Sequence, residues 1–331
     1  MTHPSIPVVD AAAVPVLTAA QMRRVDELMV EEVGINLLQM MENAGRALAE
    51  LALARFAPSS ATVLAGAGGN GGGGLAAARH LVNRGVAVRV ALASPPAPGT
   101  AAHGQLRAAL ACGATLVDPP TSSDLVIDAL VGYGLTGALR GRTAELARWA
   151  LDEEAPVLAL DAPSGLDTTT GTADPSAIRA TATLTLALPK AGLVESPVAG
   201  ELYLADISVP RSVYAELGLQ VPELFDRAPL VRLRQGADPV IGPADGTPLA
   251  WRTPLEAVRL ILIGATFATG ARIALVVGTL LTVVNLGGTF TSGEAGPATA
   301  LQAAANYLIP YVVSSLGVLS RTRIRVDDRP S

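Results

Sequence analysis

The chain has 331 residues, enough for one large α/β domain and a second, smaller unit. Its formal net charge of -5 provides no broad basic surface, which argues against a nucleic-acid partner. Because 50% of the residues are hydrophobic and only 16% are charged, the composition points to a membrane portion. Cys112 is the sole cysteine, so no internal disulfide can form, and its apolar surroundings predict a small core residue.

Helices and strands are predicted to alternate through most of the chain. Residues 1–16 read as a loose lead-in, and a capping-box pattern at Thr18 opens the first helix. Short apolar runs bounded by turns are typical of strands buried on both faces. This alternation predicts an α/β fold with a doubly wound, mostly parallel, Rossmann-like sheet in a domain over residues 1–220. The predicted helices cover residues 18–32, 37–55, 75–84, 99–111 and 143–151, and the predicted strands cover residues 61–65, 86–93, 114–117, 124–130, 156–160, 182–188 and 201–205.

The glycine-rich stretch 65–75 lies between a predicted strand and a predicted helix, the arrangement that builds an anion site. Its spacing Gly66-x-Gly68-x-x-Gly71 also matches the dinucleotide-binding fingerprint. That fingerprint needs an acidic residue after the next strand, but strand 86–93 runs into Ser94 and two prolines. An ordinary dehydrogenase is therefore disfavoured. A flexible glycine linker is disfavoured too, because the stretch is clamped between two regular elements.

Polar side chains follow the ends of four predicted strands. Because the carboxyl ends of parallel strands meet at one edge of a sheet, these side chains are expected to converge there. Each one alone has a structural explanation, since Asp and Ser cap helices and a lysine can simply be solvated. Their convergence favours a binding or catalytic site instead. The residues are Asn70, Asp128, Asp161, Ser164 and Lys190.

Taken together, the motifs in residues 17 to about 218 resemble the NAD(P)H-hydrate epimerase family, also called the YjeF N-terminal domain. The joint order of these motifs is more specific than any single one. They are Leu17-Thr-x-x-Gln-Met22 with Asp26, Met41-Glu-Asn-Ala-Gly45, Gly66-x-Gly-x-Asn-Gly-Gly-x-Gly-Leu75, Asp128-Ala-Leu-x-Gly-x-Gly-Leu135, Asp161-x-Pro-Ser-Gly-Leu-Asp167, Pro189-Lys-x-Gly-Leu193 and Asp206-Ile.

The resemblance implies an isomerase that interconverts the two C6 epimers of hydrated NADH or NADPH, a nucleotide repair reaction. C6 carries a hydroxyl beside the ring nitrogen, so the carbon can lose and regain oxygen through an iminium-like species. Inversion then requires a proton shuttle. Our hypothesis is that Asp161 is the catalytic acid or base, and that Lys190 either tunes it or holds the departing oxygen.

The resemblance also implies a potassium ion and a set of substrate contacts. Carried over by position, the ion would be held by Asn70, Asp128 and Ser164 with nearby backbone carbonyls, since hard oxygen ligands suit such a cation. The loops 69–73 and 132–138 would cradle the pyrophosphate and the nicotinamide half. The implied substrate contacts are Gly69, Asn70, Gly71, Gly72, Gly73, Gly132, Tyr133, Gly134, Leu135, Thr136, Gly137, Ala138 and Asp161.

Two positions depart from the family pattern Gly-x-Gly-Asn-Asn-Gly-Gly-Asp-Gly. This chain has Gly69 at the first asparagine and Gly73 at the aspartate. The extra glycines raise the entropy cost of ordering the loop, and the missing carboxylate is expected to weaken substrate binding or to alter the ribose contacts. A non-catalytic nucleotide sensor on the same fold is therefore the second hypothesis.

The C-terminal third predicts a linker over residues 221–254, which holds six prolines, and a helical hairpin over residues 255–331. Residues 273–289 and 301–320 carry no charge and reach the length of membrane spans. Arginines at both outer ends place the catalytic domain at the cytoplasmic face of the cell membrane. Residues 258–269 are expected to lie along the interface. The alternative is a buried helical hairpin in a soluble domain.

Two asparagines, Asn285 and Asn306, are expected to bond across this hairpin or to a neighbouring copy. The hairpin also resembles the small two-helix NrtS family, which implies nitrate or nitrite transport as a third hypothesis. Two helices make no pore alone, so a homo-oligomer is expected. Anchoring the enzyme at the membrane is the simpler function for these helices.

Overall fold

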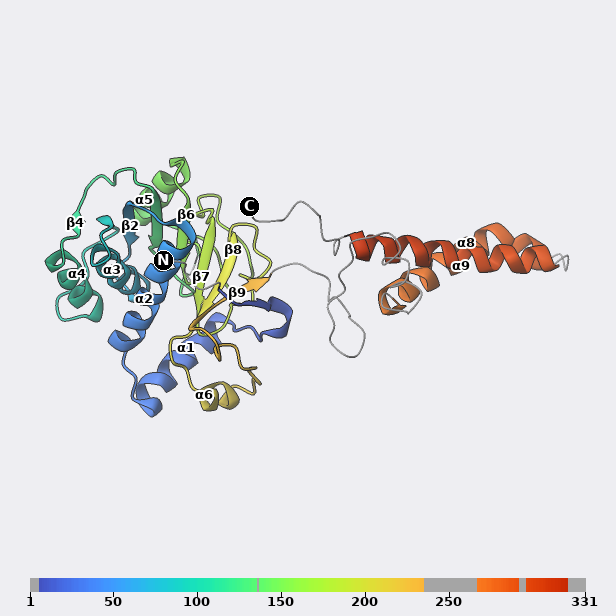
Figure 1. The fold of residues 1–331 in the computed structure, drawn as a ribbon, viewed down its shortest axis with the longest axis horizontal. Coiled ribbons are helices and arrows are strands. Elements are labelled where there is room, and N and C mark those ends of the chain that lie inside the picture. Colours follow the sequence, from blue (N-terminus) through green and yellow to red (C-terminus); the bar gives the residue numbers. More distant parts are fainter. Residues whose placement is uncertain (1–5, 136, 235–266, 292–295, 321–331) are drawn as a thin grey trace, which may run out of the picture. The chain divides into compact units, whose positions relative to one another are not determined.

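The computed structural model describes residues 6–135, 137–234, 267–291 and 296–320, and the chain divides into two compact units, residues 1–236 and 237–331. The first unit is built on a nine-stranded sheet in the order β1-β9-β8-β7-β6-β5-β2-β3-β4 (Figure 1). All neighbouring strands are parallel except β8 and β9. The strands are β1 (Val8–Asp10), β2 (Ser60–Ala65), β3 (Ala87–Leu92), β4 (Thr115–Leu116), β5 (Leu125–Ala129), β6 (Val157–Leu160), β7 (Ala182–Leu186), β8 (Glu201–Ala205) and β9 (Leu230–Arg234).

The strand order shows where the winding of the sheet reverses. From β2 the chain passes through α3 (Gly69–Val82) to β3 and through α4 (Ala101–Ala111) to β4. It then returns to the other side of β2 with β5 and continues outward to β6, β7 and β8. The switch point therefore lies between β2 and β5, where open α/β sheets bind ligands beyond the carboxyl ends of the strands. This confirms the predicted mostly parallel α/β sheet.

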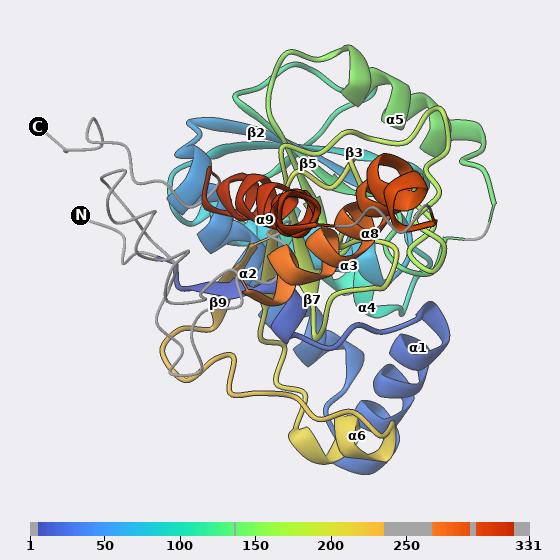
Figure 2. The ribbon, with the colours of Figure 1, turned by 90° about the vertical axis from the view of Figure 1, so that its right-hand side faces the viewer.

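Helices cover both faces of the sheet. The helices α2 (Leu37–Phe56), α3 and α4 lie on one side of β2 and β5, and α5 (Gly141–Asp152) lies on the other (Figure 2). Side chains alternate accordingly along β2, since Val63 packs in the core under α2 and α3 while Leu64 packs in the core under α5. The helices α1 (Ala19–Leu28) and α6 (Arg211–Glu216) lie side by side.

The predicted capping box at the start of α1 is present. The Thr18 hydroxyl accepts a hydrogen bond from the Gln21 backbone N–H at 3.2 Å, and the Gln21 side chain accepts one from the Thr18 N–H at 2.9 Å. Such reciprocal bonds satisfy two N–H groups that lack a partner within the helix. A π-helical turn, Met29–Val33, follows α1 and ends at Gly34, where φ is +78°. These ends fix α1 and hence the placement of its Asp26 side chain.

The glycine stretch is largely helical, which corrects the prediction of a turn that reaches residue 74. Helix α3 begins at Gly69, because close packing outweighs the low helix propensity of glycine. A Cβ atom at Gly71 would lie 1.8 Å from the Gly66 carbonyl oxygen, and one at Gly74 would lie 2.3 Å from the Ala129 Cβ. A Cβ atom at Gly69, in contrast, would meet no atom within 4 Å. The inner glycines thus let α3 press against the sheet, whereas Gly69 faces open space.

Two alanine substitutions on α3 separate these roles. Gly69→Ala is expected to stabilise the domain by up to about 1 kcal/mol, the difference in helix propensity. Gly74→Ala gains the same propensity but must push Ala129 away, so we expect a net loss of about 1–3 kcal/mol. Urea unfolding of both variants provides the measurement, and each variant is the control for the other. Equal stabilisation by both would contradict the close-packing explanation.

Two predicted irregular segments contain strands. Within the expected lead-in, β1 pairs in parallel with β9, and β9 lies in the first part of the segment expected to be a linker. Leu230, Val231 and Leu233 are buried there, so residues 230–234 belong to the sheet. Residues 235–254 of that segment lie outside the described residues. Cys112 is exposed at the end of α4, so the prediction of a core position is wrong.

The second unit contains two helices, α8 (Phe267–Thr291) and α9 (Pro297–Ser320), which pack against each other as a hairpin. A Cβ atom at Gly278 would lie 2.5 Å from the Tyr307 ring, so the glycine admits the ring. The Asn306 amide donates to the Thr282 hydroxyl at 3.2 Å, which confirms its predicted bond across the hairpin. Asn285 is exposed.

The predicted membrane spans at 273–289 and 301–320 are not supported. No helix in the described part of the chain combines the length and the apolar character needed to cross a membrane. The prediction rested on the length of the two segments and on their lack of charge. Of the predicted interfacial segment, residues 258–266 lie outside the described residues. The expected homo-oligomer stays a prediction, which light scattering on the full chain would measure.

Candidate functional site

A cavity of about 590 Å³ lies at the switch point of the sheet. Its walls come from α1, α2, the start of α3, the ends of β6 and β7, and the segments that follow β5, β6 and β8. Both apolar and titratable side chains reach it, as is typical of small-molecule sites. The lining residues are Met22, Arg23, Asp26, Leu37, Met40, Met41, Ala44, Gly68, Gly69, Asn70, Gly73, Leu130, Val131, Gly132, Tyr133, Gly134, Leu160, Asp161, Leu186 and Ile207.

The N-terminus of α3 forms one wall of this cavity. Gly68 is the residue before the helix, Gly69 is its first residue, and a Cβ atom at either would meet no atom within 4 Å. The first N–H groups of a helix have no partner within it, and the helix dipole places positive potential beside them. This wall can therefore hold a phosphate group without a basic side chain.

Asp161 projects into the cavity from the end of β6. Its backbone adopts a φ of +67°, a left-handed conformation that is costly for a residue with a side chain and that recurs at functional sites. The conformation is held by a hydrogen bond from the Asp161 N–H to the Leu184 carbonyl at 2.7 Å. One carboxylate oxygen accepts from the Tyr133 N–H at 2.8 Å, and the other accepts from the Lys190 ammonium.

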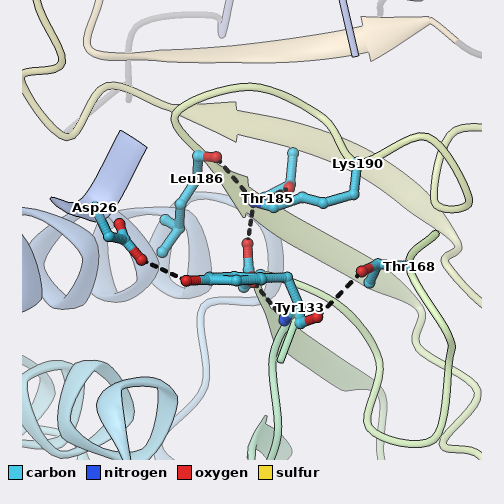
Figure 3. A network of polar contacts seen from close by, with 7 residues as sticks. Asp26, Tyr133, Thr168, Thr185, Leu186 and Lys190 are labelled. Carbon is cyan, nitrogen blue, oxygen red and sulfur yellow. Dashed lines mark hydrogen bonds and ion pairs between the residues drawn. The ribbon is translucent and has the colours of Figure 1, made fainter. Parts of the chain in front are cut away.

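Lys190 is fully buried and forms an ion pair with Asp161, and Figure 3 shows it beside Thr185 and Leu186. Its ammonium donates to Asp161, to the Thr185 hydroxyl at 3.3 Å and to the Leu186 carbonyl at 3.0 Å, which uses its three protons. Lys190 does not line the cavity, whereas Asp161 does. Of the two roles considered for Lys190, the geometry favours tuning of Asp161 over holding a departing oxygen.

The three expected metal ligands lie in two groups. Asp128, fully buried at the end of β5, accepts hydrogen bonds from the Ser164 N–H at 2.7 Å and from the Ser164 hydroxyl at 2.6 Å. Burial raises the pKa of Asp128 to about 6. Asn70 lines the cavity, and its side-chain oxygen lies beside Gly132 together with the Asp161 carboxylate. The Asn70 amide nitrogen is buried without a hydrogen-bond partner.

The expected substrate contacts divide between the cavity wall and its surroundings. Gly71 and Gly72 pack against Gly66 and Met41, which explains why glycine is needed there without a ligand. Thr136 lies outside the described residues. The expected contacts that line the cavity are Gly69, Asn70, Gly73, Gly132, Tyr133, Gly134 and Asp161, and those that do not line it are Gly71, Gly72, Leu135, Gly137 and Ala138.

Sequence reasoning missed the wall formed by α1 and α2. The side chains of Met22 and Met40 provide apolar surface there, and Asp26 adds a second carboxyl group. The Tyr133 hydroxyl donates to Asp26, and burial raises the pKa of this carboxyl above its usual value. Asp26 stood in a recognised motif, but helical periodicity alone does not show which face meets the sheet edge.

Comparison with known proteins matches residues 37–192 to the family described as YjeF-related protein N-terminus. The NAD(P)H-hydrate epimerase of Dehalogenimonas lykanthroporepellens is 44% identical over 219 residues, which cover 64% of this chain and 89% of that protein. The NAD(P)H-hydrate epimerase of Truepera radiovictrix is 37% identical over 212 residues, with coverage of 62% and 94%. The bifunctional NAD(P)H-hydrate repair enzyme Nnr of Salinibacter ruber is 38% identical, and this chain spans only 42% of its length.

A solved structure shows the same fold. The crystal structure of the yeast protein ynu0 matches 66% of this chain and 100% of its own chain, with a TM-score of 0.60 at 22% sequence identity. Three observations point to the same family: the sheet, the cavity at its switch point, and the sequence identity to epimerases that are matched over most of their length. The chain belongs to the NAD(P)H-hydrate epimerase family, a family of isomerases.

Proposed function

We propose that this protein inverts C6 of hydrated NADH or NADPH. The observation that carries the proposal is the Asp161–Lys190 pair, which lies at the end of β6 with only its carboxylate side open to the cavity. The cavity also contains the open N-terminus of α3, which suits a pyrophosphate. A carboxylate and an anion site in one cavity suit the nicotinamide and the pyrophosphate of a hydrated nicotinamide nucleotide.

The chain's own residues supply a proton shuttle. Asp161 accepts or donates the proton that accompanies departure and return of oxygen at C6, as a positioned general acid or base. Lys190 balances the negative charge of Asp161, and the Tyr133 N–H holds one carboxylate oxygen in place. The apolar side chains of Met22, Met40 and Leu186 cover the cavity wall, which limits access of bulk water to the ring.

We further propose that potassium binds beside this shuttle, held by Asn70, Asp128 and Ser164. The chemistry of these residues fits the ion, because Asp128 is a buried carboxylate that makes no ion pair within the described part of the chain. Turning the Asn70 amide would place its oxygen where the unpartnered nitrogen now lies. Bound there, a cation would supply positive charge to offset the buried Asp128 carboxylate.

Potassium is expected to change the pH dependence of stability through Asp128. A folded-state pKa of about 6, above the usual 3.8, means that the folded protein gains stability as pH falls through that value. Without potassium, we expect the wild type to gain about 1 kcal/mol relative to Asp128→Asn between pH 7 and pH 5. Potassium should remove this gain by stabilising the wild type at pH 7. Urea unfolding of both proteins in potassium and in tetramethylammonium buffers measures this gain in stability. If the wild type unfolded identically in the two buffers, the proposed potassium site would be contradicted.

The activity itself is tested by incubating the full chain with the R form of hydrated NADH and following the S form. Turnover above the spontaneous rate supports epimerisation. Binding without turnover would instead favour the nucleotide sensor, which the missing side chains at Gly69 and Gly73 make the second candidate. Repeating the assay with hydrated NADPH measures the preference between the two substrates. Location at the cytoplasmic face of the membrane stays a prediction.

A further inference from the structure

A second carboxyl group in the cavity has no assigned role. Asp26 reaches the cavity from α1, and no ion pair of Asp26 occurs within the described residues. The groups that face it are the Tyr133 hydroxyl, Arg23 on its own helix, and more distantly Lys190 and Asp161. Burial raises the pKa of Asp26, while the hydrogen bond from Tyr133 acts in the opposite direction.

Tyr133 joins the two carboxyl groups of the cavity. Its backbone N–H donates to Asp161 at 2.8 Å, and its hydroxyl donates to Asp26 (Figure 3). The Thr168 hydroxyl donates to the Tyr133 carbonyl at 3.3 Å, and the Lys190 ammonium lies 5.8 Å from the centre of the Tyr133 ring. Asp161 and Asp26 are thus held at opposite ends of one tyrosine, with a different environment at each end.

The difference in environment matters for inversion at a single carbon. Loss of the C6 hydroxyl requires an acid, and addition of water from the other face requires a base. Enzymes that invert a similar cationic centre in sugars use two separated carboxyl groups, one as acid and one as base. Asp161 is paired with the buried Lys190 ammonium, whereas Asp26 is half-buried, makes no ion pair within the described residues and accepts from the Tyr133 hydroxyl, so the two are suited to opposite roles.

We propose that Asp26 is the second acid–base group of the site and acts on the face of the nicotinamide ring opposite Asp161. In one direction protonated Asp26 gives its proton to the C6 hydroxyl, the C–O bond breaks and water leaves an iminium ion. A water on the other face adds to C6 and gives a proton to the Asp161 carboxylate. The reverse reaction runs with these two roles exchanged. This inference rests on the proposed epimerase function.

Three variants of the full chain test the role. Asp26→Asn keeps an oxygen that accepts from Tyr133 but has no acid form, so kcat should fall by about 10²–10³-fold with little change in KM. Glu27→Gln, the neighbouring exposed carboxylate outside the cavity, is the matched control and should retain the wild-type kcat. Thermal unfolding of each variant checks that a loss of rate is not a loss of fold.

Tyr133→Phe supplies a readout that a structural role would not move. The Tyr133 hydroxyl lowers the pKa of Asp26, so its removal should raise that pKa. Because Asp26 acts in its protonated form, the alkaline limb of the kcat profile should then move to higher pH. In Asp26→Asn this limb should be absent. An alkaline limb that stays in place in both variants would overturn the proposal.

The source of the oxygen provides a separate measurement. In isotopically labelled water, the wild type should place one solvent oxygen at C6 for each inversion, measured at early times by mass spectrometry. Retention of the original oxygen would overturn the two-sided mechanism. A wild type that does not exceed the spontaneous rate would reject the epimerase function itself. An active wild type with equal kcat in Asp26→Asn and Glu27→Gln would reject only the role of Asp26.

Discussion

Asp161→Asn is expected to lower kcat for epimerisation by about 10³-fold while leaving KM within about threefold of the wild type. Asparagine retains an oxygen to accept from the Tyr133 N–H and tolerates the left-handed backbone at this position. It cannot exchange a proton at the working pH. A fall in kcat alone therefore reports loss of the proton shuttle and not loss of substrate binding.

This substitution also leaves Lys190 buried without its counter-charge, which typically costs about 3–5 kcal/mol. The double variant Asp161→Asn with Lys190→Met removes both charges and should recover most of that stability. Its kcat should stay as low as that of Asp161→Asn, so stability and activity separate. Asp152→Asn, an exposed residue before the opposite end of β6, is the matched control and should behave as wild type.

Kinetics at saturating and limiting substrate measure both quantities, and urea unfolding measures the stability of each variant. A kcat within a few-fold of the wild type would remove Asp161 from the chemistry. A rise in KM with an unchanged kcat would show that Asp161 only binds the nucleotide.

The central strands and the site that they carry were predictable because their signals are local. β2, β5 and β6 are short apolar runs that each end in a glycine-rich or polar turn, and parallel pairing brings those turns together. The convergence of Asp161, Tyr133 and Asn70 in one cavity follows from this arrangement alone. The strained backbone of Asp161, in contrast, has no sequence signal apart from the family motif.

The edges of the sheet were not predictable because their stability comes from distant partners. Val9 aligns with Leu233 in the pairing of β1 with β9. Each of these short strands is held in the sheet by the other, so neither segment alone predicts a strand. The same holds for the helical glycines, since the close approach of Gly74 to Ala129 joins two elements that are not neighbours in sequence. Asp26 was overlooked for a similar reason, because its partner Tyr133 lies more than a hundred residues along the chain.

The hairpin was predicted correctly as two helices, but its predicted membrane spans were not supported. Both helices form where the apolar segments predicted them, and Asn306 bonds to Thr282 as expected. Length and absence of charge did not establish a membrane span. Helix formation was predictable from the two uncharged apolar segments, whereas the surroundings of the helices were not.

Lys190→Met is expected to lower kcat at neutral pH by about 10²-fold and to destabilise the domain by about 3–5 kcal/mol. Methionine fills a similar volume but leaves the Asp161 carboxylate nearly buried, with a 5% exposed side chain and no counter-charge. Kinetics at saturating substrate measure the fall in kcat, which reports loss of the group that holds the Asp161 carboxylate in place.

The stability change has the same cause as the loss of rate. In Lys190→Met the nearly buried Asp161 carboxylate loses its counter-charge, so the free energy of unfolding should fall. Urea unfolding measures this difference, and the double variant that also carries Asp161→Asn is the control in which neither charge is buried alone. If Lys190→Met matched the wild type in stability and in kcat, the buried ammonium would not govern Asp161, because removing an effective counter-charge from a buried pair must change both.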